Sequence, residues 1–295
     1  MPSTRDIRRR IKSVKSTAQI TKAMQMVASA KMKKAQDQAT NHRASAEMFN
    51  KILVSLREYI DENAHPFLTE GKGTKTLVVV LSTDKGLCGA LNTNLLKKLF
   101  NEFKDEADFI SVGRKGSMAL GRLKKNLLAE FQVADPARFP MIRPIGKLVQ
   151  ERFLSGEYKT VKVAFNNFIN TVSQVPMVEM LLPVNPVTLG GKRAYHEDNS
   201  AATPETSNYI PQYTFEPGVS EVLNEVLPDY VNYTLYQMML EARASEHSSR
   251  MVAMKNATDN AKQMVKDLTL EYNKLRQAAI TNELLEITTA KMALE

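Results

Sequence analysis

Two stretches, one at each end of the chain, repeat apolar or small residues every seven positions. The C-terminal stretch runs from Gly218 to Glu295 and contains a single proline, Pro228. One heptad row consists of Val226, Tyr233, Leu240, His247, Met254, Ala261, Leu268 and Leu275, and the other of Leu223, Tyr230, Gln237, Ala244, Met251, Thr258, Val265, Tyr272 and Ala279. Two such rows are the seam of a left-handed coiled coil. They predict a helix from Pro228 to Lys291, roughly 95 Å long at 1.5 Å per residue, which needs a partner helix.

The N-terminal stretch supplies that partner. No proline or glycine interrupts it from Ile7 to Ile60, and Asp6 lies in the first turn, where the helix dipole favours an acid. One heptad row consists of Ile7, Val14, Thr21, Ala28, Ala35, His42, Phe49 and Leu56, and the other of Ile11, Ala18, Gln25, Met32, Ala39, Ala46, Leu53 and Ile60. Because the two helices come from opposite chain ends and enclose a globular segment, we expect them to pair antiparallel. The small residues in mid-seam bury little area, so this pairing is weak unless something surrounds it.

The segment between the helices has a different pattern. Residues 76–82 form a continuous apolar run, typical of a strand buried on both faces. Further strands are predicted at 109–112, 159–168 and 178–182, and helices at 91–103, 115–125 and 145–154. Alternating strands and helices indicate an α/β domain with a mostly parallel sheet. We therefore expect an N-terminal coiled-coil helix at 1–62, an α/β domain at 74–217 and a C-terminal coiled-coil helix at 218–295, with a polar surface loop at 190–211.

Charge and composition restrict the class of protein. The formal net charge is +8, and basic residues dominate the first 40 positions. Such a run is commonly a solvated helix face. Because this run lies on a weakly packed pair of helices, an acidic partner is an equally good interpretation. The single cysteine, Cys88, cannot form an internal disulfide, which is typical of a reducing compartment. The longest apolar run, Leu77 to Leu81, is too short to span a bilayer, and the N-terminus has no signal core, so a soluble intracellular protein is expected.

No catalytic constellation is recognisable. The small-residue loop from Ser82 to Thr93 follows a strand, but it has neither the Gly-Lys-Ser/Thr of a P-loop nor the third glycine of the dinucleotide fingerprint. A structural turn is the better interpretation. Cys88 has no histidine nearby in the sequence, which favours a buried small residue over a nucleophile. The four histidines lack metal-ligand spacing, so we expect no catalytic residue, no cofactor and no metal site.

Four stretches together resemble the gamma subunits of rotary ATP synthases, in their bacterial form. These stretches are Ile20–Ala35 (ITKAMQMVASAKMKKA), Gly86–Asn94 (GLCGALNTN), Ser245–Asn260 (SEHSSRMVAMKNATDN) and Leu268–Glu283 (LTLEYNKLRQAAITNE). They cover both chain ends and the middle segment in the order of the family. The last stretch, Thr289–Glu295, departs from the pattern, because the family usually has a Gly-Ala pair there.

The resemblance implies an antiparallel coiled-coil shaft with an inserted Rossmann-like domain at its foot. It implies a non-catalytic rotor, present as a single copy inside a ring of alternating alpha and beta subunits. The foot would bind the epsilon subunit and the proton-driven membrane ring (the c-ring). The protein would then be a peripheral membrane protein on the cytoplasmic face of the bacterial inner membrane, coupling ring rotation to conformational changes in the catalytic beta subunits.

The resemblance also implies contact residues for the beta subunits. Arg276 and Gln277 match the pair that grips a beta-subunit loop, and Thr281 lies one turn beyond. Met24 matches a position near acidic beta-subunit loops, although a heptad-seam filler is the alternative interpretation. Arg243 matches a position linked to coupling. The remaining candidates, chosen for their charge alone, are Lys31, Lys33 and Lys34.

Two alternatives compete with this interpretation. The first is a basic coiled-coil protein that binds nucleic acid, but the basic run overlaps the seam, whereas basic-region zippers keep the two in tandem. The second is a nucleotide-dependent enzyme that uses the middle domain, which the missing phosphate-binding motif disfavours.

Overall fold

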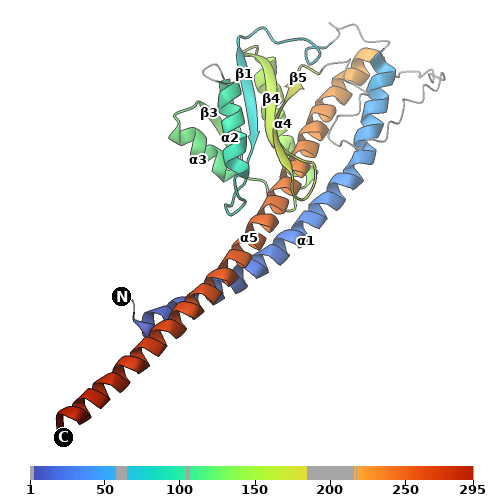
Figure 1. The fold of residues 1–295 in the computed structure, drawn as a ribbon. Helices are drawn as coiled ribbons and strands as arrows, with labels where there is room; N and C mark the ends of the chain where they lie inside the picture. The colour runs from blue at the N-terminus through green and yellow to red at the C-terminus, as the bar shows by residue number, and fades with distance from the viewer. Residues whose placement is uncertain (1–2, 58–64, 104–106, 185–215, 217, 295) are drawn as a thin grey trace. The chain divides into compact units, whose positions relative to one another are not determined.

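The computed structural model describes residues 3–57, 65–103, 107–184, 216 and 218–294, with the backbone alone over 40–57 and at 219, 293 and 294 (Figure 1). The predicted loop at 190–211 lies outside these residues. By its contacts the chain divides into two compact units. Met1–Ala28 and Arg250–Glu295 form the first, here named the terminal unit, and Ser29–Ser249 form the second, named the sheet unit.

Both predicted long helices are present. α1 spans Thr4–Arg57, and α5 spans Val219–Leu294, so that α5 begins before Pro228 rather than at it. The start of α1 is capped by Ser3. The Asp6 backbone N–H donates to Ser3 Oγ at 3.2 Å, and the Ser3 hydroxyl donates to the Asp6 carboxylate at 2.7 Å. This reciprocal pair satisfies one of the donors that a helix N-terminus leaves free.

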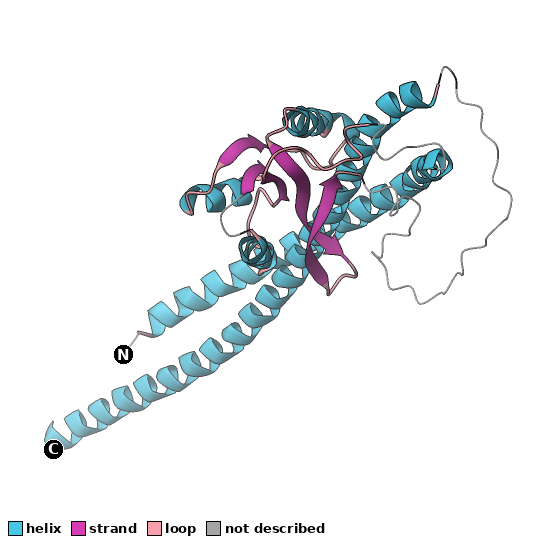
Figure 2. Cartoon of the chain, turned by 90° about the horizontal axis from the view of Figure 1, so that it is seen from above, coloured by secondary structure: helices cyan, strands magenta, loops and turns pink. Residues whose placement is uncertain are grey.

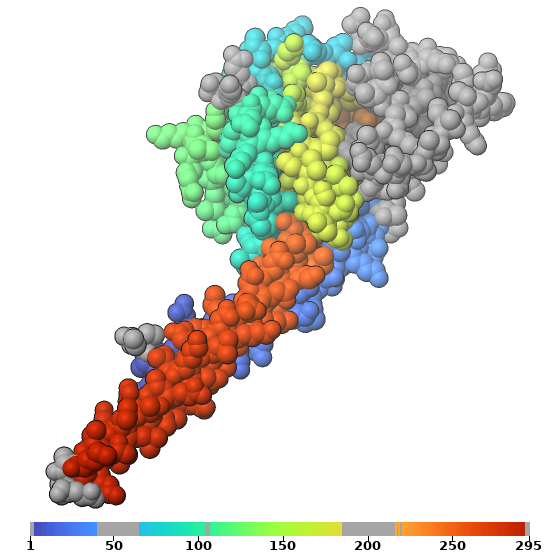
Figure 3. Space-filling view, viewed as in Figure 1, coloured from blue at the N-terminus to red at the C-terminus, as the bar shows by residue number. Residues whose placement is uncertain are grey.

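In the terminal unit, α1 and α5 pair antiparallel through the predicted heptad rows (Figure 1). The buried apolar side chains all belong to these rows, namely Ile7, Ala28, Met254, Ala261 and Leu268. Thr21 Oγ1 and Thr258 Oγ1 lie 2.7 Å apart and form a hydrogen bond across the seam. Residues 276–292 of α5 are all exposed, and Figure 3 shows these last turns without α1 beside them. The seam of the terminal unit therefore ends near Leu275.

The sheet unit contains the α/β domain predicted between the helices. Its strands are β1 (Lys75–Leu81), β2 (Ala107–Val112), β3 (Leu127–Phe131), β4 (Tyr158–Phe168) and β5 (Gln174–Leu182). They form one sheet in the order β3-β2-β1-β4-β5, in which only β5 runs antiparallel to its neighbour. The remaining elements are α2 (Leu91–Glu102), α3 (Arg114–Arg122), the 3-10 turn η1 (Phe139–Met141) and α4 (Arg143–Leu154). The predicted mostly parallel sheet is confirmed.

Helices cover both faces of this sheet, as Figure 2 shows. The central strand β1 alternates between them, because successive side chains of a strand point to opposite faces. Val78 and Val80 pack with Leu95 and Leu99 of α2 on one face. On the other face, Leu77, Val79 and Leu81 pack in the cluster that α4 and α5 complete. The continuous apolar run of β1 follows from this double burial.

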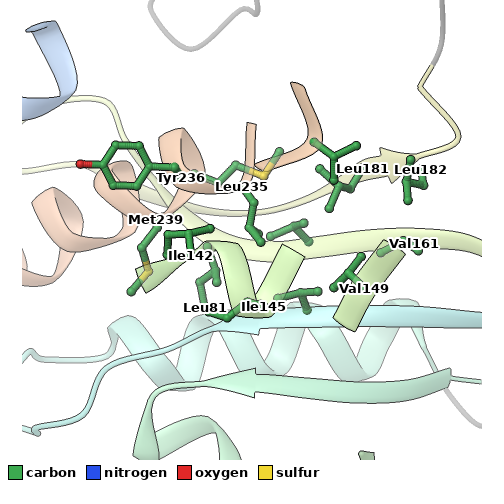
Figure 4. Packing of buried hydrophobic residues seen from close by; sticks show 14 of the residues in the cluster. Leu81, Ile142, Ile145, Val149, Val161, Leu181, Leu182, Leu235, Tyr236 and Met239 are labelled. Carbon is green, nitrogen blue, oxygen red and sulfur yellow. The ribbon is translucent and has the colours of Figure 1, made fainter. Parts of the chain in front are cut away.

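The second of these faces anchors α5. Leu235 and Met239 of α5 are each 1% exposed and lie against Ile142 and Ile145 at the start of α4 (Figure 4). Tyr236 donates a hydrogen bond from its hydroxyl to the Ala137 carbonyl at 3.3 Å. α5 is thus an integral part of the core of the sheet unit.

One strand was not predicted. β3, the sequence Leu-Leu-Ala-Glu-Phe, pairs only with β2 and forms an edge of the sheet. Its side chains are half-buried or exposed, and β-branched residues are absent from it, so its local pattern lacks the signal of a strand.

Candidate functional site: a polar socket at the carboxyl edge of the sheet

The carboxyl ends of the four parallel strands meet at one edge of the sheet. The chain proceeds from β1 to β2 and β3 on one side and then returns to β4 on the other side of β1. Such a reversal is the topological switch point at which α/β proteins usually bind a ligand. In this chain the loops at that edge are occupied by polar side chains of α5. We name these loops and side chains the socket.

Three serine hydroxyls of α5 donate hydrogen bonds to backbone carbonyl groups in the socket. The pairs are Ser245 with Asn166 (2.8 Å), Ser248 with Thr171 (2.8 Å) and Ser249 with Cys88 (2.7 Å). The accepting residues lie at the end of β4 or in the loops that follow β4 and β1. A ligand at the switch point would therefore have to displace α5.

Arg243 is the most heavily bonded of these side chains and is only 5% exposed. Its guanidinium donates to Glu246 at 2.8 Å, to Asp84 at 3.2 Å and to the Val133 carbonyl. Burial alone lowers the pKa of Arg243, but the carboxylates of Glu246 and then Asp84 outweigh it and raise that pKa above its ordinary value. The arginine therefore binds the loops after β1 and β3 to α5 by charge-assisted hydrogen bonds.

Asp135 forms a second ionic group in the socket. Its Oδ2 lies 2.7 Å from Lys31 Nζ of α1 and 3.3 Å from His247 Nε2 of α5. The His247 imidazole, and after it the Lys31 ammonium, hold the pKa of Asp135 well below its usual range, although burial opposes them. One carboxylate thus connects both long helices to the loop that follows β3.

The loop after β1 is a turn, as its sequence suggested. Leu87 and Gly89 adopt positive φ angles of 63° and 58°. The Asn92 amide donates to Thr83 Oγ1 at 2.7 Å, and that hydroxyl donates to the Lys85 carbonyl at 2.8 Å. Cys88 is 2% exposed and unbridged, which confirms a buried structural role rather than that of an exposed nucleophile.

The low pKa of Asp135 predicts a pH-dependent effect on stability. Asp135→Asn should lower the free energy of unfolding by about 1–2 kcal/mol at pH 7, because it removes a charge-assisted contact that solvent screens in part. A depressed folded-state pKa stabilises the chain in full above the unfolded value of about 3.9, and this contribution is lost gradually as the pH falls from there through the folded-state pKa. Urea denaturation should therefore show a constant difference between the two proteins from pH 7 to about pH 5 and a smaller difference at pH 3, where part of the contribution is lost. Asp37→Asn, at an exposed position on α1, is the control, and an Asp135→Asn effect as large at pH 3 as at pH 7 would contradict this explanation.

The candidate contact residues fall in both units. Met24 is half-buried in the terminal unit, and the other candidates of that unit, Arg276, Gln277 and Thr281, are exposed. In the sheet unit, Lys33 and Lys34 are exposed. Lys31 and Arg243 differ from all of these, because each already binds acidic groups within the chain.

The structure brings three of the candidates together with residues that the sequence did not single out. Lys31, Lys34 and Arg243 line a cavity of about 120 Å³ together with Asp135 and Gln38. Asp84, Asp135 and Glu246 were not predicted as site residues, and the heptad pattern indicated only that His247 lies on the seam. The i,i+3 spacing of Arg243 and Glu246 is the one local signal for this ionic group.

Comparison with known proteins identifies the family. The ATP synthase family model matches residues 3–294. The ATP synthase gamma chain of Opitutus terrae is 45% identical over 293 residues, which cover 99% of each chain, and that of Akkermansia muciniphila is 45% identical over the full length of both. The chain belongs to the ATP synthase gamma-chain family. It is accordingly a non-catalytic, central-stalk subunit, and the family matches give no support to the nucleic-acid alternative.

Solved structures agree with the gamma-chain fold. The central stalk of the Tetrahymena thermophila mitochondrial ATP synthase aligns with a TM-score of 0.59 at 27% identity, covering 81% of this chain and 99% of that one. A chain of the Euglena gracilis mitochondrial ATP synthase aligns with a TM-score of 0.67 at 20% identity, covering 99% and 94%, and shows the likeness of the fold. Among the described residues, no helix is long and apolar enough to cross a bilayer.

Proposed function

We propose that this chain is the rotor that transmits torque between a membrane ring and the catalytic ring of an ATP synthase. The observation that supports this most directly is the C-terminal part of α5, where all residues from 276 to 292 are exposed. Large apolar side chains recur there at helical spacing, at Ile280 (48% exposed), Leu284 (58%) and Ile287 (66%). An exposed apolar stripe of this kind on a helix needs a surrounding protein.

The surrounding protein in this proposal is a ring of alternating alpha and beta subunits. The basic residues at the start of α1 are exposed and available to acidic groups of that ring, namely Arg5, Arg8, Arg9, Arg10, Lys12, Lys15 and Lys22. Because a single asymmetric shaft inside a threefold ring contacts each beta subunit differently, it stabilises a different conformation in each of them. Rotation then takes every catalytic site through the same states in turn.

The individual contacts follow the family resemblance. Arg276, Gln277 and Thr281 would bind a beta-subunit loop, and their exposure in the terminal unit suits that role. Met24, Lys33 and Lys34 would lie opposite acidic beta-subunit loops. Arg243 is buried in the sheet unit, so its part in coupling would be indirect, through the strand-end loops that it binds.

The Rossmann-like domain, residues 74–217, would form the foot of the rotor between the coiled-coil segments 1–62 and 218–295. The foot would bind the epsilon subunit and the c-ring. This places the chain at the cytoplasmic face of the bacterial inner membrane as a peripheral protein. The bacterial gamma chains that match this sequence over their full length support that placement.

Reconstitution tests the proposal directly. The chain is co-expressed with the alpha and beta subunits of the same organism, and the purified complex is assayed for ATP hydrolysis. We expect a stable complex with a single copy of this chain and a hydrolysis rate that depends on it. Equal hydrolysis by the ring without this chain would overturn the proposal.

A double substitution tests the assigned beta-subunit contact. Arg276→Ala with Gln277→Ala should lower coupled ATP synthesis about tenfold or more, because truncating charged interface contacts commonly costs 2–5 kcal/mol. The free energy of unfolding of the isolated chain should change by less than about 0.5 kcal/mol, since both side chains are exposed. Lys266→Ala, at another exposed position of α5, is the control. Unchanged synthesis by an assembled complex would remove both residues from the site.

A further inference from the structure

We propose that Lys31, Asp135 and His247 form a clasp that fastens α1 to the strand-end loop and to α5, so that torque in the sheet unit is shared by both long helices. The inference rests on the proposed rotor function and gives Lys31 a role inside the chain rather than at the surrounding ring. The inference is based on a difference in packing within the sheet unit, where α5 makes many more apolar contacts than the described part of α1.

α5 is held in the sheet unit by extensive apolar packing. From Thr234 to Ser248 every side chain except Ala242 is buried, and Leu235 and Met239 belong to the main core cluster. The socket adds the ionic contacts of Arg243 and the three serine hydrogen bonds. Motion of the sheet unit must therefore carry α5 with it.

Over residues 29–39, the part of the sheet unit in which its side chains are described, α1 is held much less firmly. Its buried side chains among the described residues of the sheet unit are Met32, Ala35 and Ala39, two of which are alanines. Beside them Lys34, Ala35 and Gln38 line the cavity of about 120 Å³, which is large enough for several water molecules. A buried alanine beside a cavity makes few van der Waals contacts and removes little apolar surface from water, so it contributes little to holding α1 in place. A directed polar contact is therefore important at this level of α1.

The Lys31–Asp135 ion pair provides that contact. The two charged atoms lie 2.7 Å apart, and His247, whose side chain is 4% exposed, approaches the same carboxylate oxygen from α5. A short ion pair shielded in part from solvent is stronger than a pair of fully exposed charges. Lys33, two residues away on the same helix, is exposed and offers a matched comparison.

The loop that carries Asp135 is itself hydrogen-bonded to α5. Arg243 donates to the Val133 carbonyl before Asp135, and Tyr236 donates to the Ala137 carbonyl after it. Both donors are buried residues of α5. The residues on either side of Asp135 are consequently bonded to α5, and the Lys31 contact binds α1 to the same loop. Hydrogen-bond and salt-bridge networks between rigid elements are one route by which energetic coupling passes through a protein.

Hydrogen exchange on the full-length chain tests the clasp independently of the complex. Lys31→Met and Asp135→Asn should each accelerate amide exchange over residues 29–39 by about threefold or more, because local opening of α1 becomes easier. The double variant should exchange no faster than the faster single variant, since both changes break one contact. Lys33→Met should leave exchange unchanged. Exchange in Lys31→Met equal to the unsubstituted chain would overturn the inference.

The assembled ATP synthase tests the role of the clasp in torque transfer. We expect Lys31→Met and Asp135→Asn complexes to hydrolyse ATP at nearly the normal rate, while the protons pumped per ATP fall by a factor of about two to three. The Asp37→Asn complex should pump normally, because Asp37 is exposed on the same helix and is not among the proposed beta-subunit contacts. Normal pumping by both clasp variants would overturn this role. A complex whose hydrolysis does not depend on the unsubstituted chain would instead contradict the rotor function, and hydrogen exchange would still decide whether the clasp exists.

Discussion

Replacing Arg243 by methionine should lower the free energy of unfolding by about 3–5 kcal/mol, the usual effect of removing one partner from a buried ionic group. The substitution leaves the buried carboxylate of Glu246 and the Val133 carbonyl without the guanidinium that binds them. It also frees Asp84 at the end of β1 from α5. Because these contacts join two strand-end loops to one helix, their loss should loosen the whole socket.

Urea denaturation followed by circular dichroism measures this effect. Arg276→Met is the matched control, since Arg276 lies on the same helix but is exposed, and it should change the free energy of unfolding by less than about 0.5 kcal/mol. Adding Glu246→Gln to Arg243→Met should recover part of the loss, because it removes the uncompensated buried charge. A loss below about 1 kcal/mol in Arg243→Met would contradict the role assigned to this arginine.

Replacing Leu235 by alanine should lower the free energy of unfolding by about 2–5 kcal/mol. The side chain is 1% exposed and packs between α5 and the start of α4 (Figure 4), so its truncation leaves a cavity that the surrounding sheet and helices fill only in part. Leu270→Ala, on the same helix at 62% exposure, should change stability by less than about 1 kcal/mol. Equal effects of the two substitutions would show that α5 is not anchored through this face.

The sequence predicts the two long helices and the core of the sheet because both patterns are local. A seven-residue period can be recognised within the sequence of a single helix. A continuous apolar run such as that of β1 likewise indicates, by itself, a strand that is buried on both faces. β3 escaped prediction because it is an edge strand, formed by pairing with β2 rather than by its own alternation. The exposed contact candidates Arg276 and Gln277 came from family resemblance, since nothing in their local pattern distinguishes them.

The socket could not be predicted in the same way. Asp135 is separated from Lys31 and from His247 by about a hundred residues, and only the sheet topology brings them together. The heptad rows are also uninformative there, because α5 is buried almost all round from Thr234 to Ser248. In the terminal unit, by contrast, burial follows the rows, since one helix packs on one other helix.

The rotor function is tested most directly by watching the chain turn. Val172, which is 81% exposed in the β4–β5 hairpin, can be replaced by cysteine and linked to a bead, while the natural Cys88 is buried and does not compete. With the alpha and beta subunits fixed to a surface and ATP supplied, the bead should rotate continuously in one direction, with pauses repeating three times per turn. A bead that stays still while the same immobilised complexes hydrolyse ATP would contradict the rotor function.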